Sequence, residues 1–93
     1  MRYNGVLIQN EFRSARLTVD LHVVNVRRGV RGAKGRMQAS RDVLTRLLDP
    51  ACSPMFEFED ESGQRFNLFA ERADLLSGLC EVSSSGRVPG LLE

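Results

Sequence analysis

The sequence predicts a mainly β domain on the border between the all-β and α+β classes. The expected architecture is a small antiparallel six-stranded barrel or a strongly bent sheet, with the element order β-β-β-α-β-β-β. Three observations predict it: apolar and polar residues alternate over residues 16–27, a hairpin pattern spans residues 55–69, and only residues 41–49 have helical periodicity. A length of 93 residues suits one domain, which we expect to cover residues 1–89.

The first two strands are expected at residues 3–9 and 16–27. In the second, apolar residues occupy the odd positions up to Val23, which places one face against a core. The apolar series then moves to the even positions with Val24 and Val26. Either both faces become buried from this point, or a β-bulge near Val23 and Val24 redirects the side chains.

Three glycines at three-residue spacing follow the long strand. Gly29, Gly32 and Gly35 lie within residues 27–36, a segment that also carries five of the 13 basic residues. Because glycine favours turns and weakens strands, this segment predicts a loop or a weak hairpin. It leads into a third strand at residues 35–39.

One helix is expected at residues 41–49. Ser40 suits the N-cap position, and Asp42 suits the positive end of the helix dipole. The predicted apolar face consists of Val43, Leu44, Leu47 and Leu48. A helix this short needs support from the rest of the fold, so we expect it to cover a sheet.

The second half predicts three more strands. Phe56 and Phe58 alternate with glutamates, residues 60–63 have turn chemistry, and the following strand repeats the alternation. The last strand is expected at residues 78–84, and residues 90–93 are expected to fray.

Composition points to the cytoplasm. No apolar run approaches the roughly 18 residues that a membrane span requires, and the N-terminus lacks the pattern of a secretory signal, so we expect no membrane association. Cys52 and Cys80 have no CxxC spacing and are expected to be free thiols.

Catalytic and metal sites are not predicted, and no cofactor is expected. The single histidine, His22, lies on the polar face of the long strand, where a solvent-facing structural role is the simpler interpretation. One histidine and two distant cysteines cannot complete a four-ligand zinc site without carboxylates.

Charge is unevenly distributed along the chain. Residues 1–50 carry a net charge of +6 and residues 51–93 a net charge of −5. The candidate ligand-binding or partner-binding residues are Arg27, Arg28, Arg31, Lys34 and Arg36. Their interleaving glycines would let backbone amides approach a phosphate, although the segment has no P-loop ending and no aromatic residue for stacking. The alternative is an ordinary charged hairpin loop.

A second candidate surface is acidic. Glu57, Glu59 and Glu61 follow one another at two-residue spacing, as a surface for a basic partner would require. The alternative is the solvated face of a hairpin, balanced by a cross-strand cation such as Arg65.

Two short pieces resemble motifs of known families. Arg27 and Arg31 have the RxxxR spacing of PilZ domains, which are small barrels that bind cyclic dinucleotides, and residues 81–86 resemble their [DN]xSxxG element with Glu81 in the first place. These pieces lie farther apart than in that family and cover about a tenth of the chain. The glycines at 29–35 resemble the GxxG loop of KH domains, which joins helices rather than strands. We assign no family on this basis.

The sequence therefore favours a non-catalytic binding or adaptor domain that acts by protein contact or self-association. The alternative is an anion-binding module for nucleic acid or a phosphorylated or cyclic dinucleotide ligand, centred on residues 27–36. An enzyme is the third hypothesis, for which no acid, base and nucleophile can be named.

Overall fold

The computed structural model describes residues 1–84 and 86–92. Its strands are β1 (Arg2–Gln9), β2 (Phe12–Arg13), β3 (Leu17–Arg27), β4 (Val30–Gln38), β5 (Met55–Asp60), β6 (Arg65–Ala73) and β7 (Leu79–Ser84), and its helix is α1 (Arg41–Leu48). No helix in this part of the chain has the length and apolarity that crossing a bilayer demands.

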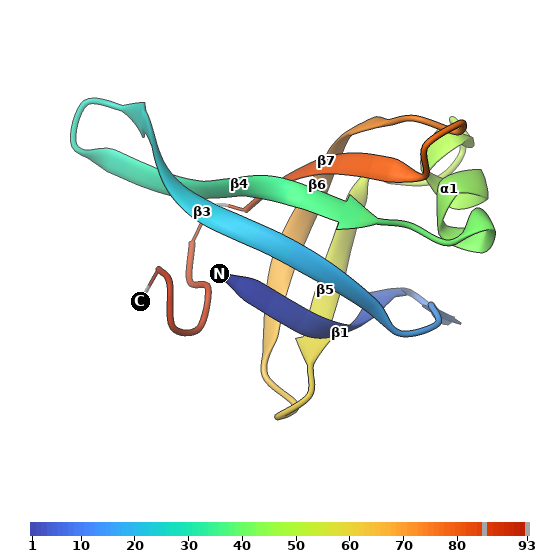
Figure 1. Cartoon of the computed structure of the whole chain (residues 1–93), viewed down its shortest axis with the longest axis horizontal. Helices are drawn as coiled ribbons and strands as arrows, with labels where there is room; N and C mark the ends of the chain where they lie inside the picture. Colours follow the sequence, from blue (N-terminus) through green and yellow to red (C-terminus); the bar gives the residue numbers. More distant parts are fainter. Residues whose placement is uncertain (85, 93) are drawn as a thin grey trace.

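The strands form a closed antiparallel barrel of six strands, as the sequence predicts. Their order is β1-β3-β4-β7-β6-β5, and β5 closes the barrel by pairing with β1 (Figure 1). The very short β2 is an extra strand that pairs with the end of β1, and it was not predicted from the sequence. All pairings are antiparallel, so each strand alternates one side chain inward and one outward.

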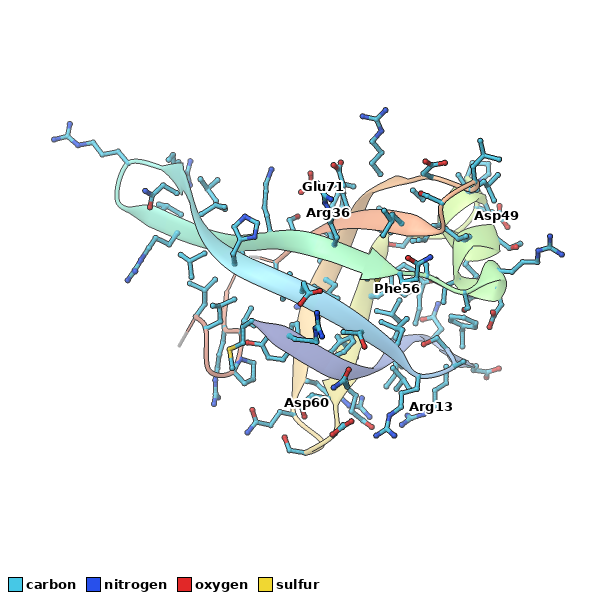
Figure 2. The ribbon with its side chains drawn as sticks, viewed as in Figure 1. Arg13, Arg36, Asp49, Phe56, Asp60 and Glu71 are labelled. Carbon is cyan, nitrogen blue, oxygen red and sulfur yellow. The ribbon has the colours of Figure 1, made fainter. Side chains whose placement is uncertain are left out.

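Large side chains of β1, β5 and β6 fill the barrel. Phe58 is fully buried, and its ring centroid lies 5.2 Å from that of Phe66, which also contacts Tyr3 edge-on at 5.2 Å. Phe56 of β5 is also buried and lies on the same inner face of the barrel (Figure 2). Burying an aromatic side chain of this size contributes about 1.5–3 kcal/mol, so these rings stabilise the closed barrel.

Helix α1 lies at one end of the barrel, where Val43 and Leu44 are buried (Figure 1). Two details of the predicted helix are wrong. Ser40 occupies the N-cap position, as predicted, but its side chain makes no capping hydrogen bond, and its buried hydroxyl has no partner among the described residues. Leu48 is exposed rather than packed, because it lies in the last turn, although it shares a helix face with the buried Leu44.

Of the two predictions for residues 27–36, the hairpin is confirmed and the loop is wrong, since β3 and β4 pair up to Arg27 and Val30 and only residues 28–29 form a turn. The glycines serve other purposes. Gly29 has a φ of 74°, which the tight turn requires. At Gly35, a Cβ atom would lie 1.6 Å from the carbonyl oxygen of Asp20, so only glycine permits the close approach of β3 and β4.

The segment after β7 covers part of the barrel near the N-terminus (Figure 1). Val88 is fully buried and forms an isolated bridge with Leu92, and the Tyr3 hydroxyl donates to the Pro89 carbonyl at 2.6 Å. Leu91 and Leu92 are partly buried against the core, although they belong to the tail expected to fray; Glu93 lies outside the described residues.

Candidate functional site

The β3–β4 hairpin extends beyond the barrel, and we call residues 22–32 the arm. Pairing between β1 and β3 ends at Arg2 and Asp20, and pairing between β4 and β7 ends at Ala33 and Ser84. Past these points β3 and β4 pair only with each other among the described residues. Figure 1 shows the arm projecting from the body of the protein.

The arm exposes three valines. Val23, Val26 and Val30 are 37%, 62% and 41% exposed. The sequence predicted either burial of both faces or a bulge near Val23 and Val24; burial of both faces is wrong, and a bulge is present but lies two residues further along the strand. The register continues evenly through these two residues and shifts only between Asn25 and Arg27, so Val26 is the extra residue of the bulge.

One edge of β3 has no strand beside it in the arm. Leu21 exchanges backbone hydrogen bonds with Met1, so the odd residues of β3 direct their backbone groups toward β1. By the same alternation, Val23 and Asn25 direct theirs to this edge, where no described residue pairs with them. The arm therefore presents an open strand edge.

The basic residues do not converge on one concavity. On β4, Ala33 and Met37 face the interior, so Lys34 and Arg36 face outward, whereas Arg31 lies on the inner side. Arg27 and Arg28 lie at the tip of the arm, and both are exposed. The five candidates are thus divided among the outer face, the inner side and the tip.

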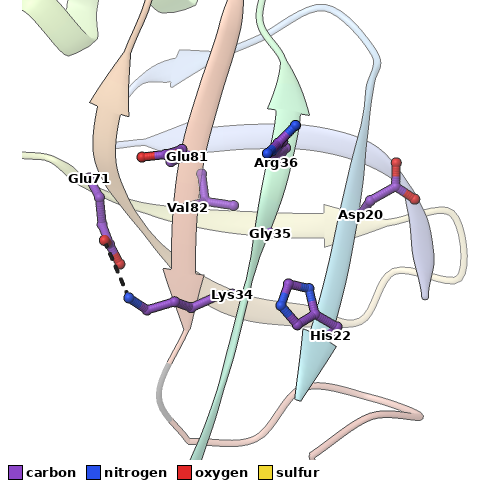
Figure 3. Close-up of a pocket in the computed structure, with 8 residues that line it drawn as sticks. All are labelled: Asp20, His22, Lys34, Gly35, Arg36, Glu71, Glu81 and Val82. Atoms are coloured by element: carbon purple, nitrogen blue, oxygen red, sulfur yellow. Dashed lines mark ion pairs between the residues drawn. The ribbon is translucent and has the colours of Figure 1, made fainter. Parts of the chain in front are cut away.

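Lys34 and Arg36 line an outer cavity of about 500 Å³, which three carboxylates also border (Figure 3). The Lys34 ammonium lies 3.8 Å from the Glu71 carboxylate. Arg36 is paired in register with Asp20 on β3 and with Glu81 on β7. Because three carboxylates border this cavity, it offers no net positive charge to an anion.

Arg31 lines a different cavity of about 260 Å³, together with Gly86, Arg87, Leu91 and Leu92. The two pieces that resemble PilZ motifs therefore approach each other in space, since Arg31 belongs to the first and Gly86 to the second. Ser83, the motif serine of the second piece, lies on β7 opposite Lys34, and Ser85 lies outside the described residues.

Two of the three candidate acidic residues are already paired within the chain. Glu59 accepts hydrogen bonds from Arg13 and Arg65, both at 2.9 Å. The Arg13 hydrogen bond, followed by that of Arg65, holds the pKa of Glu59 below its ordinary 4.5. Glu61 pairs with Arg16 at 3.2 Å, and Glu57 has no ion pair among the described residues.

These pairs belong to the end of the barrel away from the arm, where Figure 2 places Arg13 and Asp60. Asp60 organises the β5–β6 turn by accepting hydrogen bonds from Ser62 and Gln64. The Ser62 hydroxyl is the main reason that the pKa of Asp60 lies below its ordinary value. At this hairpin end, Glu59, Asp60 and Glu61 are therefore all paired with other residues of the same chain.

Two surfaces with exposed apolar side chains were not predicted from the sequence. A groove of about 430 Å³ beside the arm is lined by Val26, Met55 and Phe69, with Lys34 and Glu71 at its border. The second surface lies at the helix end of the barrel, in a cavity of about 530 Å³ lined by Leu48, Leu75 and Leu79, and Leu76 beside it is 99% exposed. The adjacent leucines before Ser77 and Gly78 were the available signal for it, because a turn exposes its side chains.

The reactive side chains are dispersed. Cys80 is fully buried, and burial raises the pKa of its thiol to about 11. Cys52 is half-buried, and His22 lies on the outer face opposite Lys34. Within residues 1–84 and 86–92, no group of three metal-ligating side chains is close enough to hold an ion.

Comparison with known proteins finds no matching protein family, curated protein or solved structure.

Proposed function

We propose that this chain is a non-catalytic protein-contact domain whose arm binds another protein or a second copy of the chain. The observation that carries the proposal is the exposure of three valines beside an open strand edge. Such edges promote unwanted pairing, so natural folds usually shorten or cover them. A contact that covers the edge explains why the arm keeps both its length and its valines.

The chemistry of the remaining residues supports binding rather than catalysis. The Cys80 thiol is buried and its pKa is raised, so little of it is the nucleophilic thiolate at neutral pH. His22 has no carboxylate hydrogen-bonded to it among the residues described, so no acid or base pair orients its ring.

The test is an arm-shortened variant. Replacing residues 25–31 with Asn-Gly joins Val24 to its paired residue Gly32 through a two-residue hairpin turn and leaves the barrel intact. Wild type and variant are compared by light scattering after gel filtration at low and high salt, and by affinity capture from cell extract. The wild type is expected to form a higher-mass species or to capture a protein that the variant does not.

The same mass and the same captured proteins for both chains would contradict this function. Circular dichroism and thermal unfolding of the shortened variant confirm that its barrel is folded, so that a lost contact reports on the arm.

A second candidate is anion binding, and the shared cavity of Arg31 and Arg87 supports it. Binding of a labelled oligonucleotide or cyclic dinucleotide would weaken steeply with salt, and replacing Arg27, Arg28 and Arg31 with alanine would reduce that salt dependence. Unchanged amide spectra with DNA, RNA and cyclic dinucleotides at low salt would exclude it.

A further inference from the structure

The open edge of β3 covers residues 22–27, about 20 Å of strand at about 3.4 Å per residue. β1 occupies this edge of β3 as far as Leu21, and the chain turns back after Arg27. The backbone N–H and C=O groups of Val23 and Asn25 point to the open edge. They have the two-residue spacing that pairs with a neighbouring strand inside a sheet. Their geometric complement is another extended chain, which is how peptides add to exposed sheet edges.

Charge identifies the kind of chain. Residues 21–41 contain six basic side chains and no acidic one. Within the arm, Arg27, Arg28 and Arg31 are exposed, and none of them forms an ion pair with a described carboxylate. The barrel differs, because several of its arginines are paired. The arm therefore carries uncompensated positive charge next to the open edge.

We propose that β3 accepts an acidic, extended segment of a partner protein as an added strand along residues 22–27. This inference rests on the proposed function and names the partner of the same surface. Apolar side chains on one face of the segment cover Val23, which lies on the same face of the arm as Ala33, while its carboxylates pair with Arg27 and Arg28 at the tip of the arm. Backbone hydrogen bonds at Val23 and Asn25 hold it in place.

Two other occupants fit the arm less well. A second copy would place two uniformly basic arms side by side, and like charges in close contact oppose association. A nucleic acid would match the charge, but it has no regular ladder of amide groups for the open edge, and residues 22–32 contain no Phe, Tyr or Trp on which bases could stack.

The test uses a capped six-residue peptide of alternating valine and glutamate as the probe. A version with N-methyl groups on alternate amides keeps one hydrogen-bonding edge, and a version methylated on every amide keeps the charges but has no donor. A four-nucleotide thymidine strand carries about the same charge. Binding is measured by titration of the full chain, following backbone amide resonances by NMR.

The expected result is that resonances of residues 22–27 shift most and that the alternately methylated peptide still binds. The fully methylated peptide should bind about tenfold more weakly or not at all, because donors at the edge are lost. Reversing two charges in R27E/R28E should also weaken binding about tenfold. R41E changes charge at the start of α1, away from the arm, and should bind like wild type.

Equal binding by the fully methylated peptide or the thymidine strand would overturn strand addition, because charge alone would then suffice. Absence of shifts at residues 22–27 would overturn it as well. If either result is found but the arm-shortened variant loses its partner contacts, the arm is a contact surface and only the proposal of strand addition is wrong. If shortening the arm changes no contact, both proposals fail together.

Discussion

The barrel and the arm are built from the same two strands, yet they differ in what they bury. Within the barrel, Val19 and Leu21 of β3 and Met37 of β4 are almost fully buried. A few residues further along the same strands, Val23 and Val26 are exposed. The sequence hardly changes in character between the two parts. The difference lies in the neighbours, because β1 and β7 accompany the hairpin only through the barrel.

The barrel and the arm also differ in whether their charged side chains lie beside side chains of opposite charge. Around the barrel, the cross-strand partners Arg2, Asp20, Arg36, Glu81 and Arg72 alternate in sign from one strand to the next. In the arm, no carboxylate interrupts the basic residues. Neutralised charges suit a surface that only faces water, whereas an uncompensated set suits a surface that meets a charged partner.

The largest expected effect concerns the barrel interior. Phe58 is fully buried, so Phe58→Ala should lower the free energy of unfolding by about 3–5 kcal/mol, a large fraction of what a domain of this size possesses. Phe69 lies on the outer side of β6 and is 41% exposed, so Phe69→Ala is the matched control with an expected loss of about 1 kcal/mol or less. Urea unfolding followed by circular dichroism measures both.

Similar losses for these two variants would contradict the assignment of inner and outer faces on β6 and β5. If Phe58→Ala does not fold at all, Phe58→Leu provides a milder change at the same site, with the same expected ranking against Phe69→Leu.

The second prediction compares two glycines of β3–β4. Gly35→Ala places a methyl group against the backbone of Asp20, and the forced separation of two central strands should cost about 3 kcal/mol. Gly29→Ala strains only a left-handed turn with open space around it, and should cost about 1 kcal/mol. Equal thermal shifts for the two variants would show that the close approach at Gly35 is not required.

These two regions also show what a sequence reveals about this fold. The alternation of phenylalanines around residues 55–69 predicted the hairpin correctly, because both strands pack one face on the same interior. The same period of two predicted burial of Val23 and was wrong there, since a strand's own sequence does not record where its neighbour ends. The order of the elements needed only local signals and was confirmed.

Only part of the candidate site could be predicted from the sequence. The basic residues were found from their spacing, but their division among the tip, the inner side and the outer face depends on the register of β3 with β4. Glu59 was expected to face a cation such as Arg65, and it does. Its second partner, Arg13, lies 46 residues away, and no local pattern indicates such a contact.

The third prediction concerns acid. The pKa values of Glu59 and Asp60 lie below their ordinary values of 4.5 and 3.8, so their pairing stabilises the folded chain above those values. As the pH falls through the lowered pKa values, the carboxylates become protonated and this stabilisation is lost. Unfolding free energy should therefore decline below about pH 4.5, and Glu59→Gln should reduce the decline. The expected effect is modest, because these pairs are near the surface.

Residues 22–32 contain no carboxylate, so arm variants should leave the acid response unchanged. An altered acid response in R27A/R28A would reveal contact between the arm and the acidic hairpin end, which the described residues do not contain.

The smallest expected effect on stability belongs to the tip of the arm. Arg27 and Arg28 are exposed and make no ion pair with a described residue, so replacing both with alanine should change the free energy of unfolding by about 0.5 kcal/mol or less. The same double variant should lose affinity for an acidic peptide, because those charges serve the contact and not the fold. Urea unfolding and peptide titration on one protein preparation measure the two effects together. A loss of stability as large as that of Gly29→Ala would mean that the tip supports the barrel, and the division between a stable body and a binding arm would then be wrong.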